Sequence, residues 1–226
     1  MNILIVSATE NEILPLVSSL NSKKERNPKL KTYSLKNLNI DVLITGVGII
    51  ATTYWLSKMV VKKKYDIALN CGIAGSFDKQ LAIGEVVNIT QDRFPELGAE
   101  DGEKFLTLSE MNLPGEDELP FIKGKLINSS KIGNKIVNQL PKVSGITVNT
   151  VHGNETNIKK IISRYDPSTE SMEGAAFLYV CLSENIQCVQ IRAISNYIEK
   201  RNRGAWNVPI AIKNLNEKIR DILNHF

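Results

Sequence analysis

Glu173 is the acidic residue whose surroundings point most directly to chemistry. It lies between a predicted strand and a predicted helix that starts with Gly174-Ala175-Ala176. The dipole of a helix favours an ionised carboxylate at its N-terminus. Such a carboxylate can accept two hydrogen bonds, as a pair of sugar hydroxyls would require. The alternative is that Glu173 only caps the helix.

Other polar or glycine-rich segments also follow predicted strands. Glu12 comes three residues after Thr9, which is capping-box spacing and by itself indicates a capping residue or an exposed carboxylate. Gly46-Val47-Gly48 and Gly72-Ile73-Ala74-Gly75 either let the backbone approach a ligand or serve sharp turns. Neither is the dinucleotide-binding fingerprint, and the sequence contains no P-loop.

The composition argues against nucleic-acid and membrane functions. The chain has 226 residues, 42% of them hydrophobic and 23% charged, which suits one large domain with a sizeable core. The net charge is +4, but the basic run Lys62-Lys63-Lys64 lacks the interleaved aromatics of a nucleic-acid patch. No apolar run reaches the roughly 18 residues of a membrane helix, and the N-terminal apolar stretch is too short for a signal peptide.

The cysteines and histidines argue against a metal site. Cys71, Cys181 and Cys188 have no CxxC spacing and are predicted to be buried free thiols in a reducing cytoplasm. His152 and His225 lie far apart in the sequence, so a His/Cys metal cluster is not expected. We therefore expect a cytoplasmic protein without a metal or other cofactor.

Strands and helices alternate along most of the chain. The predicted strands are 2–8, 30–36, 39–45, 66–69 continuing into 70–75, 85–90, 145–151 and 188–194. The predicted helices carry the apolar faces of 13–20, 51–60, 131–140, 158–164, 174–183 and 208–226, and 91–124 is predicted to be a long functional loop region. The alternation predicts one domain, 1–226, with a three-layer α/β fold. Its sheet is expected to be twisted, mixed but mostly parallel, and flanked by helices. Ligands collect at the carboxyl ends of strands in such sheets.

Four motifs, taken together, resemble those of the purine nucleoside phosphorylase/nucleosidase superfamily, on its methylthioadenosine/S-adenosylhomocysteine nucleosidase side. They are Thr9-Glu10-Asn11-Glu12, Gly72-Ile73-Ala74-Gly75, Met172-Glu173-Gly174-Ala175-Ala176 and Arg192-Ala193-Ile194-Ser195-Asn196. Within that superfamily the chain is most similar to the futalosine hydrolase family, which releases hypoxanthine from futalosine in menaquinone biosynthesis. That similarity rests on Arg93-Phe94-Pro95, Leu97-Gly98-Ala99-Glu100-Asp101-Gly102, Ser195-Asn196, Arg201-Asn202 and Trp206.

The resemblance implies roles for individual residues. Glu12 would orient the attacking water as catalytic carboxylate, Glu173 would bind the ribosyl hydroxyls, and Met172 would pack on the sugar face. The remaining implied substrate contacts are Ile73, Ala74, Gly75 and Ser195. The purine-stacking aromatic is not evident around Thr156, and Phe94 or Phe177 could replace it.

Asn196 departs from the adenine-releasing relatives, which place an Asp there. An amide cannot donate a titratable proton, but its NH₂ group can serve the O6 and N7 acceptors of a 6-oxopurine. We therefore interpret Asn196 as a catalytic residue that favours hypoxanthine. The alternative is a turn residue at a strand end.

Several alternatives stay open at this point. Glu10 and Glu12, with no nearby Arg, favour water as the attacking group, whereas Arg93 and Arg192 keep phosphorolysis possible. The alternative activities are a methylthioadenosine/S-adenosylhomocysteine nucleosidase or a purine nucleoside phosphorylase, and the alternative class is a non-catalytic nucleotide-binding module. The resemblance also implies a small-molecule purine nucleoside as ligand and a homodimer or dimer-based homo-oligomer, with 91–124 contributing.

Overall fold

The protein is built around one twisted sheet. The computed structural model describes residues 1–22 and 28–226. Its strands are β1 (Asn2–Ser7), β2 (Asn21–Ser22), β3 (Leu30–Leu35), β4 (Leu38–Ile44), β5 (Ile67–Ser76), β6 (Val86–Asp92), β9 (Phe121–Ile122), β10 (Lys125–Ile127), β11 (Lys142–Thr147), β12 (Thr169–Ser171) and β13 (Cys188–Tyr197). A separate hairpin consists of β7 (Gly98–Asp101) and β8 (Lys104–Thr107).

The sheet mixes parallel and antiparallel pairs: β4, β1, β5 and β13 run parallel, whereas β6 is antiparallel to β13. β1 lies between β4 and β5 in parallel, and β5 is also parallel to β13. β5, β13, β6, β11 and β12 pair in turn, and β12 returns to pair with β5, so these strands form a closed ring. The predicted mixed α/β fold is confirmed. The closed ring of strands was not predicted.

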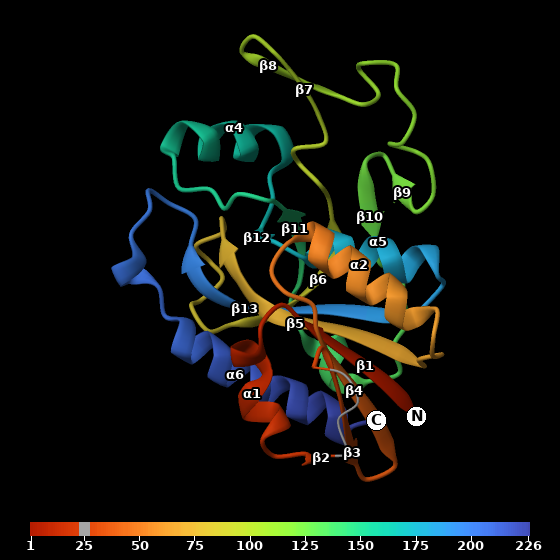
Figure 1. Cartoon of the computed structure of the whole chain (residues 1–226). Helices are drawn as coiled ribbons and strands as arrows, with labels where there is room; N and C mark the ends of the chain where they lie inside the picture. Colours follow the sequence, from red (N-terminus) through yellow and green to blue (C-terminus); the bar gives the residue numbers. More distant parts are fainter. Residues whose placement is uncertain (23–27) are drawn as a thin grey trace.

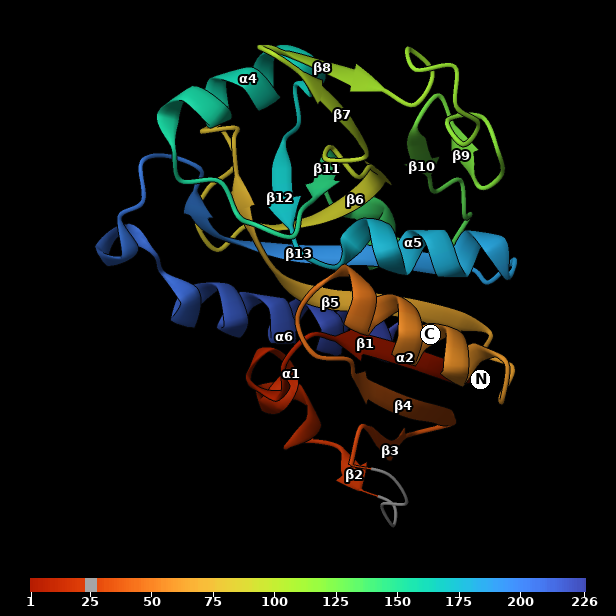
Figure 2. The ribbon, with the colours of Figure 1, turned by 45° about the horizontal axis from the view of Figure 1, so that its top comes forward.

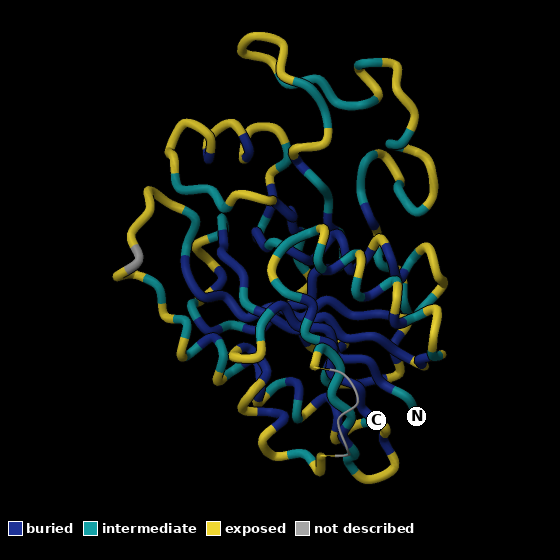
Figure 3. The backbone as a smooth tube through the Cα atoms, in the orientation of Figure 1, coloured by how far each residue is buried: buried dark blue, intermediate teal, exposed yellow. Residues whose placement is uncertain are grey.

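Helices cover both faces of the sheet (Figures 1 and 2). α1 (Glu10–Val17) and α6 (Val208–Asn224) lie on one face, and α2 (Ile49–Val60) and α5 (Gly174–Ser183) lie on the other. α4 (Glu155–Tyr165), α3 (Lys135–Gln139) and the short 3₁₀ helix η1 (Arg203–Ala205) complete the described elements. Figure 3 shows the sheet as the buried centre, with the β7–β8 hairpin projecting from it and exposed at its tip.

The core is where the apolar sequence pattern places it. Ile3, Leu4, Ile5 and Val6 of β1 are all buried, as expected for a strand with a helix layer on each side.

The three cysteines are buried and free, as predicted. Within the described part of the chain, no helix combines the length and apolarity needed to cross a bilayer.

Two predicted elements have different bounds. The helix expected over 131–140 is only α3, because the Asn134 side chain accepts hydrogen bonds from the N–H groups of Ile136 and Val137 and so starts the helix at Lys135. The strand expected over 145–151 is β11, which begins at Lys142 because it pairs with β6 and which ends at Thr147.

The prediction of a loop over 91–124 is wrong in part. The segment contains the β7–β8 hairpin and β9, and β9 pairs with β10 at the edge of the main sheet. These strands have two to four residues each, too few for an alternating pattern to stand out. β5 includes the residues 70–75 into which the predicted strand 66–69 continues. β13 runs further than predicted, so that Ser195–Asn196 lie inside the strand rather than after it.

Candidate functional site

Glu12 connects the first helix to the central strand. Its Oε2 atom accepts hydrogen bonds from the N–H and Oγ1–H of Thr9, each at 2.9 Å, and completes the predicted capping box. Its Oε1 atom accepts a hydrogen bond from the Ile73 N–H of β5 at 3.2 Å. The carboxylate is therefore a helix cap and also a buried group at the carboxyl end of the sheet.

Glu173 directly precedes α5, but its side chain does not cap the helix. The first amide groups of α5 have other partners: Ser171 Oγ accepts from Gly174 N–H at 3.2 Å, and Thr147 Oγ1 accepts from Ala175 N–H at 2.7 Å. The Glu173 side chain makes no capping bond, and its Oε1 accepts from the Gly48 N–H at 3.1 Å. The helix-cap interpretation is therefore wrong for this side chain, which points toward the α2 terminus.

Arg192 is the candidate site residue whose position the sequence did not reveal. Its side chain is 1% exposed, its Nη2 lies 3.8 Å from Glu173 Oε2, and Nη2 donates to Asn70 Oδ1 at 2.5 Å. A Cβ atom at position 72 would lie 2.1 Å from Arg192 Nη1 and 2.9 Å from Glu12 Oε1. The guanidinium thus lies between two carboxylates, over a glycine. A charged residue inside the apolar stretch 188–194 was the available signal.

The two carboxylates influence each other through this arrangement. Burial raises the pKa of Glu173, whereas Arg192 and the Gly48 N–H lower it and the charge of Glu12 raises it. The positive charge of Arg192 and the negative charge of Glu12 therefore act in opposite directions on the pKa of Glu173. A pair of carboxylates around one cation can hold hydroxyl groups or a water molecule by hydrogen bonds.

Asn196 and Ser195 lie beside the same central strand. The β13–β5 pairing shifts by one residue between Ile194 and Asn196, so Ser195 is at a bulge. Bulges re-aim side chains and are frequent beside active sites. Ser195 Oγ lies 2.8 Å from Asn196 Oδ1 and 3.2 Å from the Ala74 carbonyl oxygen, and Asn196 Nδ2 donates to the Tyr197 carbonyl oxygen at 3.0 Å.

Gly75 leaves space for this amide. A Cβ at position 75 would lie 3.2 Å from Asn196 Nδ2 and 2.2 Å from Ile198 Cδ1. Ile73, Ala74 and Gly75 are consecutive in β5, so the strand links Glu12 at one residue to Asn196 two residues on. Met172 is half-buried next to Glu173. The predicted residues other than Phe94 therefore gather along β5 and the start of α5.

The two candidates for the purine-stacking role lie in other places. Phe177 is fully buried in the core and presents no ring face to a ligand, so that alternative is wrong. Phe94 packs edge-on against Phe121, with the ring centroids 6.3 Å apart, and lines a cavity of about 90 Å³ with residues of the β7–β10 region. Its contact with substrate stays a prediction.

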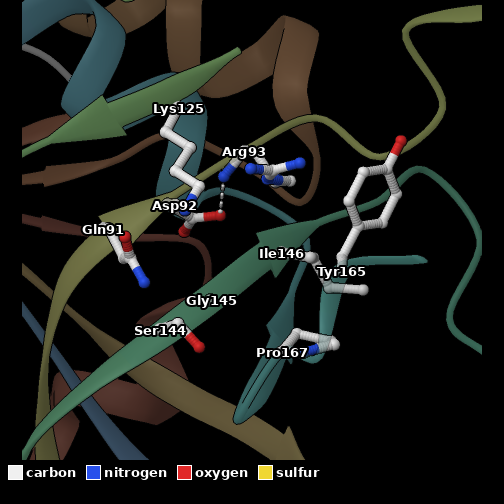
Figure 4. Close-up of a pocket in the computed structure, with 9 residues that line it drawn as sticks. All are labelled: Gln91, Asp92, Arg93, Lys125, Ser144, Gly145, Ile146, Tyr165 and Pro167. Carbon is white, nitrogen blue, oxygen red and sulfur yellow. Dashed lines mark hydrogen bonds between the residues drawn. The ribbon is translucent and has the colours of Figure 1, made fainter. Parts of the chain in front are cut away.

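A small cavity beside Asp92 is separate from the carboxylate pair (Figure 4). Its volume of about 20 Å³ is that of a water site rather than a nucleoside site. Its lining includes Asp92, Arg93, Lys125, Gly145 and Tyr165, but neither Glu12 nor Glu173.

Comparisons with known proteins concern the family and the fold of the chain. Residues 2–225 match the family model described as the phosphorylase superfamily. The chain is similar to a futalosine hydrolase from Acidothermus cellulolyticus, at 24% identity over 94% of this chain and 86% of that protein. It is also similar to a 5′-methylthioadenosine/S-adenosylhomocysteine nucleosidase from Maridesulfovibrio salexigens, at 26% identity over 91% of this chain and 90% of that protein.

The fold is shared with solved structures. The futalosine hydrolase of Helicobacter pylori superposes with a TM-score of 0.82 at 16% identity, covering 100% of this chain and 98% of that chain. At this identity the similarity concerns the fold.

Proposed function

Since the chain belongs to the phosphorylase superfamily, we propose that it is a purine nucleosidase that hydrolyses futalosine to hypoxanthine and dehypoxanthine futalosine. The observation that carries the proposal is the buried pair Glu12 and Glu173, which lies near the buried Arg192 of β13, beside Gly72 of β5. The names of the relatives support cleavage of an N-glycosidic bond, and the same relatives include enzymes with two different substrates.

The ribose is bound by Glu173. Its carboxylate is buried, is fixed by the Gly48 N–H, and keeps acceptor capacity for hydroxyl groups because it does not cap α5. Met172 lies beside it and packs on the sugar. An oxocarbenium-like transition state at C1′ is then formed next to a fixed negative charge.

Water is the attacking group, and Glu12 orients it. The Glu12 carboxylate is fixed by hydrogen bonds from Thr9 and Ile73 and lies near Arg192. Its remaining lone pairs can accept hydrogen bonds from a water molecule. A phosphate dianion would have to displace carboxylates that already surround the Arg192 guanidinium. Arg93 stacks on Tyr165, with its Cζ 4.6 Å from the ring centroid. This charge arrangement favours hydrolysis over phosphorolysis.

The leaving purine is held by Asn196 with Ser195 beside it. One hydrogen of the Asn196 amide is used by the Tyr197 carbonyl, and the second can serve a purine acceptor. A 6-oxopurine offers acceptors at O6 and N7, which suits this donor. This residue is the reason for placing hypoxanthine ahead of adenine.

A second copy of the chain is the proposed partner. Ile50 and Tyr54 on α2 are 82% and 56% exposed, and Tyr179 on the neighbouring α5 is 39% exposed. Exposed apolar patches of this kind mark association surfaces. Light scattering coupled to size-exclusion chromatography should give about twice the mass of 25.2 kDa. A monomer at all concentrations would reject the dimer.

The proposed activity is tested by product analysis. Purified protein incubated with futalosine in phosphate-free buffer should release hypoxanthine at a rate that added phosphate does not change. Adenine release from methylthioadenosine, without hypoxanthine from futalosine, would reject the substrate, and a strict need for phosphate would reject hydrolysis. Glu12→Gln should bind the nucleoside but not turn it over, whereas a non-catalytic binding protein has no rate to lose.

A further inference from the structure

Asp92 is a buried carboxylate under the first turn of α5. Its Oδ1 accepts hydrogen bonds from the Arg93 N–H at 2.8 Å and from Thr147 Oγ1–H at 3.1 Å. Its Oδ2 accepts from Gln190 Nε2 at 3.0 Å. The residue is 2% exposed and lies outside the set that the site uses.

Two glycines make room for this carboxylate. A Cβ at Gly145 would lie 3.1 Å from Asp92 Oδ2, and a Cβ at Gly174 would lie 2.5 Å from the same atom and 1.9 Å from Gln190 Nε2. Gly174 is the first residue of α5. Asp92 and Gln190 are thus packed directly against the point where the helix begins.

Thr147 transmits the position of Asp92 to the helix. The same Oγ1 that donates to Asp92 accepts the Ala175 N–H at 2.7 Å. This bond, with the Ser171 bond to Gly174 N–H, supplies the helix cap that Glu173 does not supply. A fixed negative charge near a helix N-terminus also interacts favourably with the helix dipole.

Hydrogen-bond donors from several elements act on the pKa of Asp92. Burial raises its pKa to about 6, whereas Gln190, the Arg93 N–H, Thr147 and the charge of Arg192 lower it. In Figure 4 the Lys125 side chain extends toward it from β10. Burial outweighs these donors, so the pKa of Asp92 stays above that of a free aspartate.

We propose that Asp92 is a positioning residue for Glu173. Its carboxylate orients Thr147 and Gln190 against the first turn of α5, and this turn determines where the Glu173 carboxylate faces the sugar. Glu173 is the residue directly before that turn, so a shift at Gly174 moves it. The inference rests on the proposed function, in which Glu173 binds the ribosyl hydroxyls.

Asp92→Asn removes the charge with little change in shape. Gln190 Oε1 is buried without a hydrogen-bond partner among the described residues, so a rotated Gln190 amide can accept from the introduced side-chain amide. Thr147→Val removes the hydroxyl link, and Thr147→Ser keeps it. Asp41→Asn is the matched control, because Asp41 is a buried carboxylate on β4 that bonds to Thr32, Lys63 and Tyr65.

The kinetic test compares a ribonucleoside substrate with its 2′,3′-dideoxy counterpart. For the ribonucleoside, Asp92→Asn and Thr147→Val should lower kcat/KM by roughly 10- to 100-fold, because a small misplacement of a substrate-positioning group has effects of this size. For the dideoxy compound, which lacks the hydroxyls, the losses should be less than about threefold, and Thr147→Ser should restore most of the rate. Equal losses on both substrates would show that Asp92 does not act through Glu173.

A second measurement does not depend on turnover. Amide hydrogen exchange at Gly174 and Ala175, without substrate, should be faster by about tenfold in Asp92→Asn and Thr147→Val because their first-turn bonds are weakened. It should be unchanged in Asp41→Asn and Thr147→Ser. Unchanged exchange in all variants would overturn the positioning role even if the enzyme is active. A wild type that cleaves no nucleoside would reject the proposed function, and exchange would still decide whether Asp92 orders this turn.

Discussion

The Nη2 atom of Arg192 lies 3.8 Å from Oε2 of Glu173, and both side chains are buried. Arg192 also donates to Asn70 Oδ1, and both its guanidinium and the Glu12 carboxylate lie next to Gly72. The arrangement offsets the burial of two carboxylates with one cation, so the cation is needed both for stability and for the shape of the site.

Replacing the cation should be strongly destabilising. Arg192→Met would leave Glu173 and Glu12 buried without it, and the free energy of unfolding should fall by about 3 kcal/mol or more. Urea denaturation at neutral pH measures this. Arg164→Met is the control, because Arg164 is exposed and its guanidinium stacks on the rings of Phe105 and Tyr165 rather than on a buried carboxylate. Similar losses in both variants would contradict the pairing.

Adding one methyl group at position 72 should disturb the same cation. The Cβ introduced by Gly72→Ala would lie 2.1 Å from Arg192 Nη1, and a fully buried guanidinium has little room to move away. We expect a loss of about 2 kcal/mol of stability, together with a fall in kcat/KM. Thermal or urea unfolding checks the first effect and product release the second.

The control for this change is Gly133→Ala. A Cβ there meets nothing within 4 Å, so stability should stay within about 0.5 kcal/mol of the wild type. A Gly72→Ala protein as stable and active as Gly133→Ala would mean that Arg192 is not confined.

Asp92 should make stability depend on pH. Its folded pKa of about 6 lies above the value of 3.8 for the free side chain, so between these pH values the folded protein keeps a proton that the unfolded chain has lost. The stabilisation of the folded protein by this proton is fully present below about pH 4 and is lost as the pH rises through about 6. The free energy of unfolding should fall by about 2 to 3 kcal/mol over this range.

The Asp92→Asn variant removes this titration. Its unfolding free energy, measured in urea from about pH 4 to about pH 7, should therefore decline less with rising pH than that of the wild type. Glu173, whose pKa is also raised, acts in the same direction and remains in both proteins. Parallel pH curves would show that Asp92 has no elevated pKa.

Asn196→Asp should change which base leaves. The substitution replaces the Nδ2 donor to the Tyr197 carbonyl with a carboxylate oxygen, and it places negative charge toward the O6 and N7 acceptors of a 6-oxopurine. The rate of hypoxanthine release should fall by about 100-fold, because a buried hydrogen bond to the purine is lost and a repelling charge takes its place. Parallel assays with futalosine and methylthioadenosine measure the ratio. Unchanged rates on futalosine would remove Asn196 from base selection.

Much of the layout was predictable from the sequence. The apolar runs at 2–8 and 188–194, the capping box at Thr9 and Glu12, and the helix after Glu173 are local patterns, and each corresponds to an observed element. The order of these elements also predicts a mixed sheet between helix layers, since buried strands and amphipathic helices must cover one another. The motif residues Glu12, Glu173 and Asn196 were identified through the resemblance of their motifs to those of a known superfamily.

Only the tertiary structure decided which partners these side chains have. Whether Glu173 caps its helix depends on Ser171 and Thr147, which take over the helix amides, and the Thr147 contact joins residues 28 apart in sequence. Likewise Arg192 becomes part of the site because β13 pairs with β5 in the register that sets it over Gly72. Local spacing specifies helices and strands, but contacts between distant segments depend on strand register and helix packing, and these determine which atom of a carboxylate remains available to a ligand.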